Sequence, residues 1–359
     1  MNAGIAMNEG SKVVKSAITK LMDGKDLSRE ESRLVMNEIM EDRATDAQIS
    51  AYLVALRMKG ETVDEITGSI EALTDKNDVV KLRYDNVVDI CGTGGDNLST
   101  FNISTSAAII CAGAGVAVAK HGNRSVSSKC GSADFLKKVG VNIDISIEHV
   151  LRCFKEIGLA FIFAPRYQPS WRYINGPRME IGARTIFNIL SPLANPARIK
   201  RQVIGVYDPS LMRIIISVMK ELGAEQVMVV HGQDGMDEIS ISGKTKIVEL
   251  INDEIYEYEI SPENFHLRTA SLSAIQSSNC QESINYLKDI LAAKKCPATD
   301  VAVLNAAAAI KVSGKVNSLY EGVELAFDSI KSGKAKLKLE KLIEMTNAKN
   351  WNVSITESD

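Results

Sequence analysis

Short apolar runs alternate with helical segments through most of the chain after residue 86. Runs typical of buried strands cover 87–91, 116–119, 160–163, 203–206 and 227–230, because short β-branched runs are typical of strands buried on both faces. A capped, alanine-rich segment begins near residue 104, between the first two runs, and Gly113 and Gly115 follow it. This order predicts a βαβ unit of a parallel sheet. Its loops open at the carboxyl edge, where α/β proteins bind their ligands.

Residues 11–76 show a different pattern, with helical periodicity and no strand-like run. Three capping boxes predict three helix starts: Ser28 with Glu31, Thr45 with Gln48, and Thr62 with Glu65. Gly24 and Gly60 lie where helices should end. Two apolar stripes are predicted to face a core, one formed by Ile49, Leu53 and Leu56 and the other by Leu34, Met36, Ile39 and Met40. Because so short a bundle cannot bury both stripes alone, we predict that two copies of the chain form a homodimer through this region.

The remaining segments complete the sheet and its covering helices. Helices are predicted at 135–139, 147–157, 211–222, 279–294 and 301–309, and alternating strands within 247–260. Residues 166–176 are predicted to be a loop rich in aromatic and polar side chains, and two prolines limit helix length in 185–197. The sequence SIKSGKAKLKLEKL predicts one basic amphipathic helix with a solvated face.

Composition narrows the class of protein. A chain of 359 residues favours two domains, and its net charge of -3 argues against a dedicated nucleic-acid binder. No apolar run approaches the roughly 20 residues that span a bilayer, and the start lacks a secretory core, so we expect a cytoplasmic protein with no membrane partner. The six cysteines, Cys91, Cys111, Cys130, Cys153, Cys280 and Cys296, show no metal-binding spacing and are predicted to be reduced thiols.

Two polar loops follow the first two predicted strands and should meet at one sheet edge. The first reads GTGGD (92–96) and the second KHGNR (120–124). Free backbone N–H groups, a helix N-terminus, several hydroxyls and a lysine together indicate a site for phosphate groups. Neither loop matches the dinucleotide-binding or P-loop pattern. We therefore expect a different kind of phosphate site.

A third polar loop, HGQDGMDE (231–238), follows the predicted strand at 227–230. Its acidic residues Asp234, Asp237 and Glu238 repel one another unless a cation lies between them. Oxygen ligands without cysteine or paired histidine suit Mg²⁺, which commonly bridges carboxylates and substrate phosphates. A solvated acidic turn is the alternative interpretation.

The strings GTGGD, TFNIST, KHGNRSVSS and GSAD, in this order, closely resemble the signature of the anthranilate phosphoribosyltransferase family. The similarity extends from about residue 18 to about residue 344. It implies a small N-terminal all-helical domain (1–84, joined by helices around 184–200) and a larger α/β domain (85–359). The sheet of the larger domain should be mostly parallel and flanked by helices. The resemblance also implies a homodimer.

The family's activity implies the reaction. The phosphoribosyl group of 5-phosphoribosyl 1-diphosphate (PRPP) would move to the amine of anthranilate, releasing diphosphate, in the second step from chorismate to tryptophan. The implied metal is Mg²⁺, one or two ions per subunit, at Ser104, Asp237 and Glu238. The implied anthranilate contacts are Gly92, His121, Asn123 and Arg178. The implied PRPP contacts are Gly92, Gly95, Asp96, Thr100, Asn102, Ile103, Ser104, Thr105, Lys120, His121, Gly122, Asn123, Arg124, Ser125, Val126, Ser127, Ser128 and Ser132.

The chemical properties of the side chains suggest roles for some of these implied contact residues. A guanidinium can pair with the carboxylate of an aromatic acid, which suits Arg178, although an ion pair with Glu180 would explain the same residue. An aromatic amine is a neutral nucleophile that needs no activation, so His121 is assigned to packing and hydrogen bonding, and His231 to a structural role.

The chain departs from the family pattern at Gln168 (usually histidine), Pro177, Cys130 (usually serine) and Ser191 (usually glycine). Gln168 faces the acceptor side, so transfer to a different aromatic acceptor is one alternative function. A pyrimidine nucleoside phosphorylase and a non-catalytic relative that binds nucleic acid are two others. The phosphorylase would not need the acidic pair, and the nucleic-acid binder would be expected to be more basic.

Overall fold

The computed structural model describes residues 9–75, 80–82, 84, 86–124 and 130–348. Its centre is a seven-stranded sheet in the order β3-β2-β1-β4-β5-β6-β7. The first five positions are parallel: β1 (Val88–Gly92), β2 (Val118–Gly122), β3 (Leu159–Phe163), β4 (Arg201–Gly205) and β5 (Gln226–Gly232). The strands β6 (Thr245–Ile251) and β7 (Glu254–Ile260) extend one edge antiparallel. The predicted mostly parallel sheet is confirmed.

Alternate residues of the central strands enter two different cores. Val88 and Ile90 of β1 belong to one core, whereas Cys91 of the same strand belongs to the other. In β5, Met228 enters the first core and Val229 the second. A sheet buried on both faces needs apolar residues at successive positions, which explains the continuous apolar runs in the sequence.

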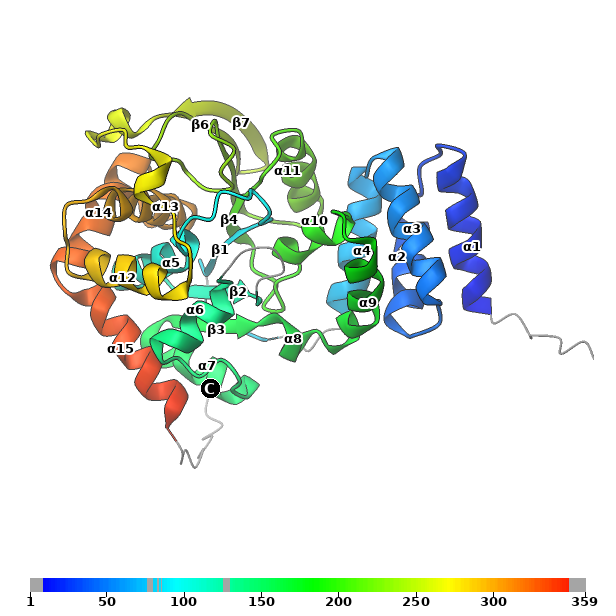
Figure 1. Cartoon of the computed structure of the whole chain (residues 1–359), viewed down its shortest axis with the longest axis horizontal. Helices are drawn as coiled ribbons and strands as arrows, with labels where there is room; N and C mark the ends of the chain where they lie inside the picture. The colour runs from blue at the N-terminus through cyan, green and yellow to red at the C-terminus, as the bar shows by residue number, and fades with distance from the viewer. Residues whose placement is uncertain (1–8, 76–79, 83, 85, 125–129, 349–359) are drawn as a thin grey trace, which may run out of the picture.

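Helices cover both faces of the sheet (Figure 1). One face carries α5 (Ile103–Gly113), α7 (Ile147–Ile157), α13 (Pro297–Val312), α14 (Leu319–Lys331) and α15 (Lys334–Asn347), whose apolar side chains form the first core. The helices α6 (Ser132–Val139) and α12 (Cys280–Leu291) pack beside them. The other face carries α11 (Leu211–Glu221).

The N-terminal helices form a separate group to one side of the sheet (Figure 1). They are α1 (Glu9–Met22), α2 (Arg29–Met40), α3 (Asp46–Lys59) and α4 (Val63–Asp75), joined by α9 (Arg172–Ile181) and α10 (Ile186–Leu193). The three predicted capping boxes are confirmed by reciprocal hydrogen bonds. Both apolar stripes are buried apart from Leu34, which is 43% exposed. Packing of α9, α10 and α11 on these helices covers apolar surface within the chain.

Two predicted elements differ in the structure. The second strand begins at Val118 rather than Val116, so Lys120, His121 and Gly122 end β2 instead of forming a loop. The predicted loop 166–176 is mostly helical: it contains the end of α8 (Ala164–Tyr167), a 3₁₀ turn (Pro169–Trp171) and the start of α9. The helix continues through Pro177 because packing outweighs the cost of the lost donor.

The C-terminal prediction of one solvated helix is also wrong. Gly333, with a φ of 75°, separates α14 from α15. Leu339, Leu342 and Met345 of α15 are buried against the sheet domain, so this basic segment contributes core as well as surface. Within the described residues, no helix has the length and apolarity needed to cross a membrane.

Candidate active site

A cavity of about 250 Å³ opens at the carboxyl ends of the parallel strands. It is lined by Cys91, Gly92, Gly94, Asn102, Ser104, Thr105, Lys120, His121, Gly122, Asn123, Cys130, Gly131, Ser132, Ala164, Trp171, Ser191, Pro192, Asp237 and Glu238. The three predicted polar loops therefore meet, as the sheet topology requires. Residues 191–192, at the end of α10, supply the wall nearest the helical group.

Glycines let the first loop and the acidic loop approach each other. The backbone N–H of Gly94 donates to Asp237 Oδ2 at 2.7 Å. A Cβ on Gly92 would lie 2.6 Å from the same oxygen, and a Cβ on Gly205 would overlap the backbone of Asp237. Gly94 and Gly95 have φ values of 65° and 80°, which glycine adopts without strain. Close backbone approach is thus the physical reason for these glycines.

Asp237 and Glu238 place two half-buried carboxylates in the cavity wall. Burial, followed by repulsion from Asp96, raises the pKa of Asp237 to about 7. Burial and then the charge of Asp237 raise the pKa of Glu238 well above its usual range. Glu238 Oε1 accepts from the backbone N–H of Ser104 at 3.2 Å. Two adjacent, half-buried carboxylates that favour protonation form a site where a cation would stabilise the charged forms.

The described residues contain no cluster of three or more His, Cys, Asp or Glu side chains with metal-binding geometry. The two carboxylates and the Ser104 hydroxyl still fit Mg²⁺, because this ion usually takes only one or two carboxylates from the protein and completes its shell with waters and substrate phosphates. Asp234 does not join them. Its carboxylate accepts hydrogen bonds from Ser240 and Ser242 instead, which corrects the prediction of three acidic residues around one cation.

Lys120 brings a buried positive charge to the cavity. Its Nζ donates to the carbonyl of Ile90 at 2.5 Å and to Ser104 Oγ at 3.3 Å. Asp89 lies behind it in β1. Its carboxylate accepts from the backbone N–H of His121 at 3.1 Å and from Asn195 Nδ2 at 2.8 Å. Burial raises the pKa of Asp89, and the charge of Lys120 opposes that rise.

Several polar atoms of the cavity wall are buried without a hydrogen-bond partner in the described part of the chain. They are Asn102 Oδ1, Thr105 Oγ1, His121 Nε2 and Trp171 Nε1. Unpaired buried polar groups are costly and therefore uncommon in proteins. Four of them around one cavity indicate a polar ligand that would complete their hydrogen bonds.

The predicted site residues fall into three groups. Eleven line the cavity: Gly92, Asn102, Ser104, Thr105, Lys120, His121, Gly122, Asn123, Ser132, Asp237 and Glu238. Gly95, Asp96, Thr100, Ile103, Arg124 and Arg178 do not line it. Of these, Ile103 is 1% exposed, in the core under α5, and the exposed Arg124 lies 5.9 Å from the ring centre of Phe163. Ser125, Val126, Ser127 and Ser128 lie outside the described residues.

Arg178 and Gln168 lie on the side of the helical group. Burial lowers the pKa of Arg178, whose guanidinium carbon lies 5.5 Å from the ring centre of Phe187. Among the described residues it makes no ion pair with Glu180. Gln168 is buried, and its Nε2 donates to the carbonyl of Ala194 at 2.7 Å, while its Oε1 has no partner in the described part of the chain.

Eight residues that line the cavity were not among the predicted site residues, Trp171 among them, and Arg184 beside the cavity was also missed. Trp171 lines the cavity from the 3₁₀ turn that was predicted to be a loop. Arg184 donates from Nη2 to the carbonyl of Gly95, and its guanidinium carbon lies 3.7 Å from the ring centre of Tyr207. Only the density of aromatic and cationic residues in 166–184 pointed to this segment.

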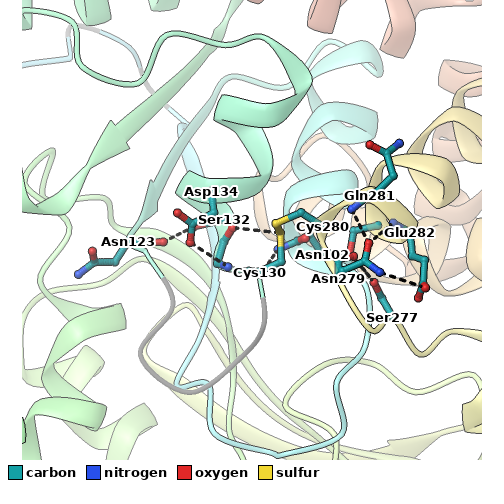
Figure 2. The surroundings of a disulfide bond; sticks show 12 residues. Asn102, Asn123, Cys130, Ser132, Asp134, Ser277, Asn279, Cys280, Gln281 and Glu282 are labelled. Carbon is teal, nitrogen blue, oxygen red and sulfur yellow. Dashed lines mark hydrogen bonds between the residues drawn. A yellow bond between two sulfur atoms is a disulfide. The ribbon is translucent and has the colours of Figure 1, made fainter.

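The cysteines also differ from the prediction of six reduced thiols. Cys130 and Cys280 form a disulfide with their Cα atoms 5.2 Å apart (Figure 2). Cys91, Cys111, Cys153 and Cys296 are free. The pairing joins residues 150 positions apart in the sequence, so cysteine spacing gave no sign of it.

Comparisons with known proteins identify the class that this fold and site define. Residues 84–336 match the model of the glycosyl transferase family, a/b domain, and residues 15–76 match that of the glycosyl transferase family, helical bundle domain. The chain therefore belongs to this glycosyl transferase family of two-part enzymes.

Individual relatives assign the chain to one branch of this family. The chain is 47% identical over 336 residues to an anthranilate phosphoribosyltransferase of Acetivibrio thermocellus, covering 94% of this chain and 97% of the relative. The crystal structure of the Thermus thermophilus enzyme of that name superposes with a TM-score of 0.87 at 36% identity, covering 92% of this chain and 99% of that one. A Saccharomyces cerevisiae anthranilate phosphoribosyltransferase in complex with PRPP and Mg gives a TM-score of 0.86 at 26% identity, with 95% and 99% covered. Within the glycosyl transferases, the chain is a member of the anthranilate phosphoribosyltransferase family.

Proposed function

We propose that the chain transfers the phosphoribosyl group of PRPP to the amine of anthranilate, giving N-(5-phosphoribosyl)anthranilate and diphosphate. The observation that carries this proposal is the half-buried pair Asp237 and Glu238 beside the first glycine loop and Lys120 in one cavity. Carboxylates, backbone N–H groups and a lysine are together suited to a metal-bound diphosphate.

The donor would bind along the ends of β1 and β2. Lys120, Asn102 and Thr105 would bind phosphate oxygens, because each presents a polar group to the cavity. Ser104, Asp237 and Glu238 would hold Mg²⁺, which when bound supplies the positive charge that offsets the charge of diphosphate. Mg is also present in the yeast relative bound to PRPP.

The transfer breaks the bond between ribose C1 and a diphosphate oxygen and forms a bond from C1 to the anthranilate nitrogen, which then loses a proton. Positive charge develops on the ribose as diphosphate leaves. The residues of the cavity therefore act chiefly by holding the leaving group and aligning the amine. Asn123 would orient anthranilate in the cavity, with Gly92 permitting its close approach. Arg178, which lies beside the cavity and does not line it, would pair with the anthranilate carboxylate from the side of the helical group.

His121 would contribute a hydrogen bond rather than a proton transfer. Burial, and then the neighbouring charge of Lys120, lower the pKa of His121 to about 3. A neutral imidazole with so low a pKa is a weak base at pH 7. Its buried Nε2 has no partner in the described residues, so this nitrogen is available to the substrate.

We also propose that two copies associate through the helical group. Large apolar side chains stay exposed there: Met22, Leu34, Val54, Met58 and Met179. Met58 is 83% exposed and Met22 is 76% exposed. Sedimentation of the wild type at micromolar concentration should show a dimer, and Met58→Lys should weaken that dimer. A wild-type monomer at this concentration would contradict the proposed association.

The function is tested by the loss of anthranilate fluorescence after PRPP and Mg²⁺ are added. Wild type should consume anthranilate, and the double variant Asp237→Asn with Glu238→Gln should lose at least about a hundredfold in rate, since each change removes a charge from the diphosphate site. Asp234→Asn is the matched control, because Asp234 belongs to the same loop but bonds to Ser240 and Ser242. The control should retain the wild-type rate.

Calorimetry measures binding of the donor, PRPP, independently of whether anthranilate is the acceptor. Tight PRPP binding without anthranilate consumption would contradict the proposed acceptor and point to Gln168, which Gln168→His would then test. Phosphorolysis of thymidine or uridine would instead establish a nucleoside phosphorylase.

A further inference from the structure

We propose that the Cys130–Cys280 disulfide is a site of thiol–disulfide exchange, open to a dithiol reductant, whose state controls PRPP affinity. The link to PRPP rests on the proposed function of the neighbouring cavity. No other pair of cysteines is joined in the described part of the chain.

One end of the disulfide forms part of the cavity wall. Cys130, Gly131 and Ser132 all line the cavity. The Cys130 carbonyl accepts from Asn102 Nδ2 at 3.1 Å, and Ser132 Oγ donates to the carbonyl of Asn123 at 3.2 Å. Figure 2 shows the disulfide beside these contacts. Displacement of Cys130 would therefore disturb two residues, Asn102 and Asn123, that the proposed function places against substrates.

The other end lies in a capped helix. Cys280 is the first residue of α12, and the Asn279 side chain accepts from the backbone N–H groups of Gln281 and Glu282 at 2.9 and 3.1 Å. Ser277 Oγ and Ser283 Oγ lie 3.0 Å apart in a further buried contact. The disulfide therefore fixes the cavity wall to an element that has no residue in the cavity.

The two sulfur atoms differ in access and in leaving ability. Cys280 is only 5% exposed, whereas Cys130 is half-buried and lines the cavity. A reductant thus reaches the sulfur of Cys130. The sulfur of Cys280 then leaves as a thiolate at the N-terminus of a 12-residue helix, a position that stabilises a thiolate. A more stable leaving thiolate departs faster.

The exchange is balanced with a dithiol as the named co-reactant. One thiolate of the reagent attacks Cys130 Sγ, the S–S bond breaks, and the electron pair leaves on Cys280 Sγ, which takes up a proton. The second thiolate of the reagent then attacks the reagent's other sulfur atom in the mixed disulfide. This attack releases Cys130 Sγ as a thiolate, which takes up a proton. The reagent is oxidised to a disulfide by two electrons, and the two cysteines are reduced.

Reduction would remove the covalent link from Cys130 to α12, so that the described residues hold the segment 130–132 through hydrogen bonds and the start of α6. A less ordered wall must be ordered again when PRPP binds, which lowers affinity. Coupling between two binding events is reciprocal. PRPP in the cavity should therefore shift the equilibrium of the exchange toward the disulfide, and reduction should weaken PRPP binding by about 5-fold or more, the lower range of measured couplings.

The test uses the full chain and counts thiols by alkylation and mass spectrometry. Protein oxidised with a cyclic disulfide reagent should show four free thiols, and dithiothreitol should raise the count to six. At a fixed ratio of reduced to oxidised dithiothreitol, PRPP with Mg²⁺ should lower the fraction of protein that has the two new thiols at equilibrium. Calorimetry should give weaker PRPP binding to the reduced form.

Variants identify the cysteine responsible. Cys280→Ser should bind PRPP like the reduced wild type and should not respond to dithiothreitol. Cys296→Ser is the matched control, since Cys296 is a free thiol outside the cavity, and it should respond as the wild type does. Six free thiols after oxidation, or equal PRPP affinity of both forms, would overturn the proposal. Redox-dependent PRPP binding without phosphoribosyl transfer would contradict only the proposed reaction.

Discussion

Arg184 joins three parts of the site through one side chain. It lies just before α10, donates to the carbonyl of Gly95 in the first loop, and stacks on Tyr207 after β4. The planar guanidinium can make the hydrogen bond while its face stacks on the ring, whereas an ammonium group has no planar face to stack. Arg184 is therefore a positioning residue for the first glycine loop.

We predict that Arg184→Ala raises the KM for PRPP about tenfold or more, because a hydrogen bond from a charged group contributes roughly 1.5–3 kcal/mol and 1.4 kcal/mol is tenfold in affinity. The value of kcat should change less. Arg184→Lys should recover only part of the loss, since it restores charge without the planar contact. Steady-state kinetics with varied PRPP measures both constants. An unchanged KM in Arg184→Ala would exclude the positioning role.

His121 gives a second prediction at this scale, on pH and stability. Its pKa in the fold, about 3, lies below the usual 6.5, so the fold favours the neutral ring. The contribution of His121 to the free energy of unfolding is complete above pH 6.5. It is lost as pH falls toward 3, at about 1.4 kcal/mol per pH unit at most. Urea unfolding from pH 6.5 to 4.5 should show a shallower decline for His121→Gln than for wild type. His149→Gln, which changes α7 outside the cavity, should decline as wild type does.

At the scale of elements, the close approach of β4 to the acidic loop holds the carboxylates in place. Gly205 ends β4, and a Cβ there would overlap the backbone of Asp237. The acidic loop can therefore lie against the strand only while residue 205 has no side chain.

We predict that Gly205→Ala lowers both stability and Mg²⁺-dependent activity. Overpacking of this kind usually costs about 1–3 kcal/mol, and the shift of Asp237 should reduce activity by more than tenfold. Gly243→Ala is the control, because a Cβ at Gly243 meets no atom within 4 Å. Denaturant unfolding and the fluorescence assay measure the two effects. Equal behaviour of the two variants would show that the approach of the loop is not required.

The helices and strands show which parts of the fold could be predicted from the sequence. Apolar periodicity gave the parallel strands and three helix starts because burial on both faces and capping boxes leave local signals. The helix α9 was not predicted because Gly176 and Pro177 both disfavour helix, and only tertiary packing outweighs them. Eleven predicted residues line the cavity since they lie at the ends of strands, in the loops after them or at the starts of the helices that follow. Arg184 and the disulfide depend on contacts distant in sequence, which no local pattern encodes.

For the whole molecule, the most consequential feature is a core shared between the helical group and the sheet. Leu53 and Ile70 of the N-terminal helices belong to the same buried cluster as Ile216 of α11 and Val229 of β5. The two parts of the chain are therefore packed together rather than linked as separate bodies. Each part depends on the other for burial of its apolar surface.

This shared core predicts one unfolding transition. The fluorescence of Trp171, which is buried in the shared cluster, should change at the same denaturant concentration as the far-UV circular dichroism signal, as two-state unfolding requires. Trp351→Phe removes the second tryptophan of the chain. An earlier fluorescence transition would show that the helical group unfolds separately.

The strand β7 forms the outer edge of the sheet, and its sequence bears on how molecules of this protein meet. It carries Glu254, Glu257 and Glu259, and most of its residues reach solvent. Charged side chains along an edge strand disfavour the addition of a strand from another molecule. Copies of the chain at high concentration should thus resist the growth of a continuous intermolecular sheet, and ordered self-association is left to helical surfaces.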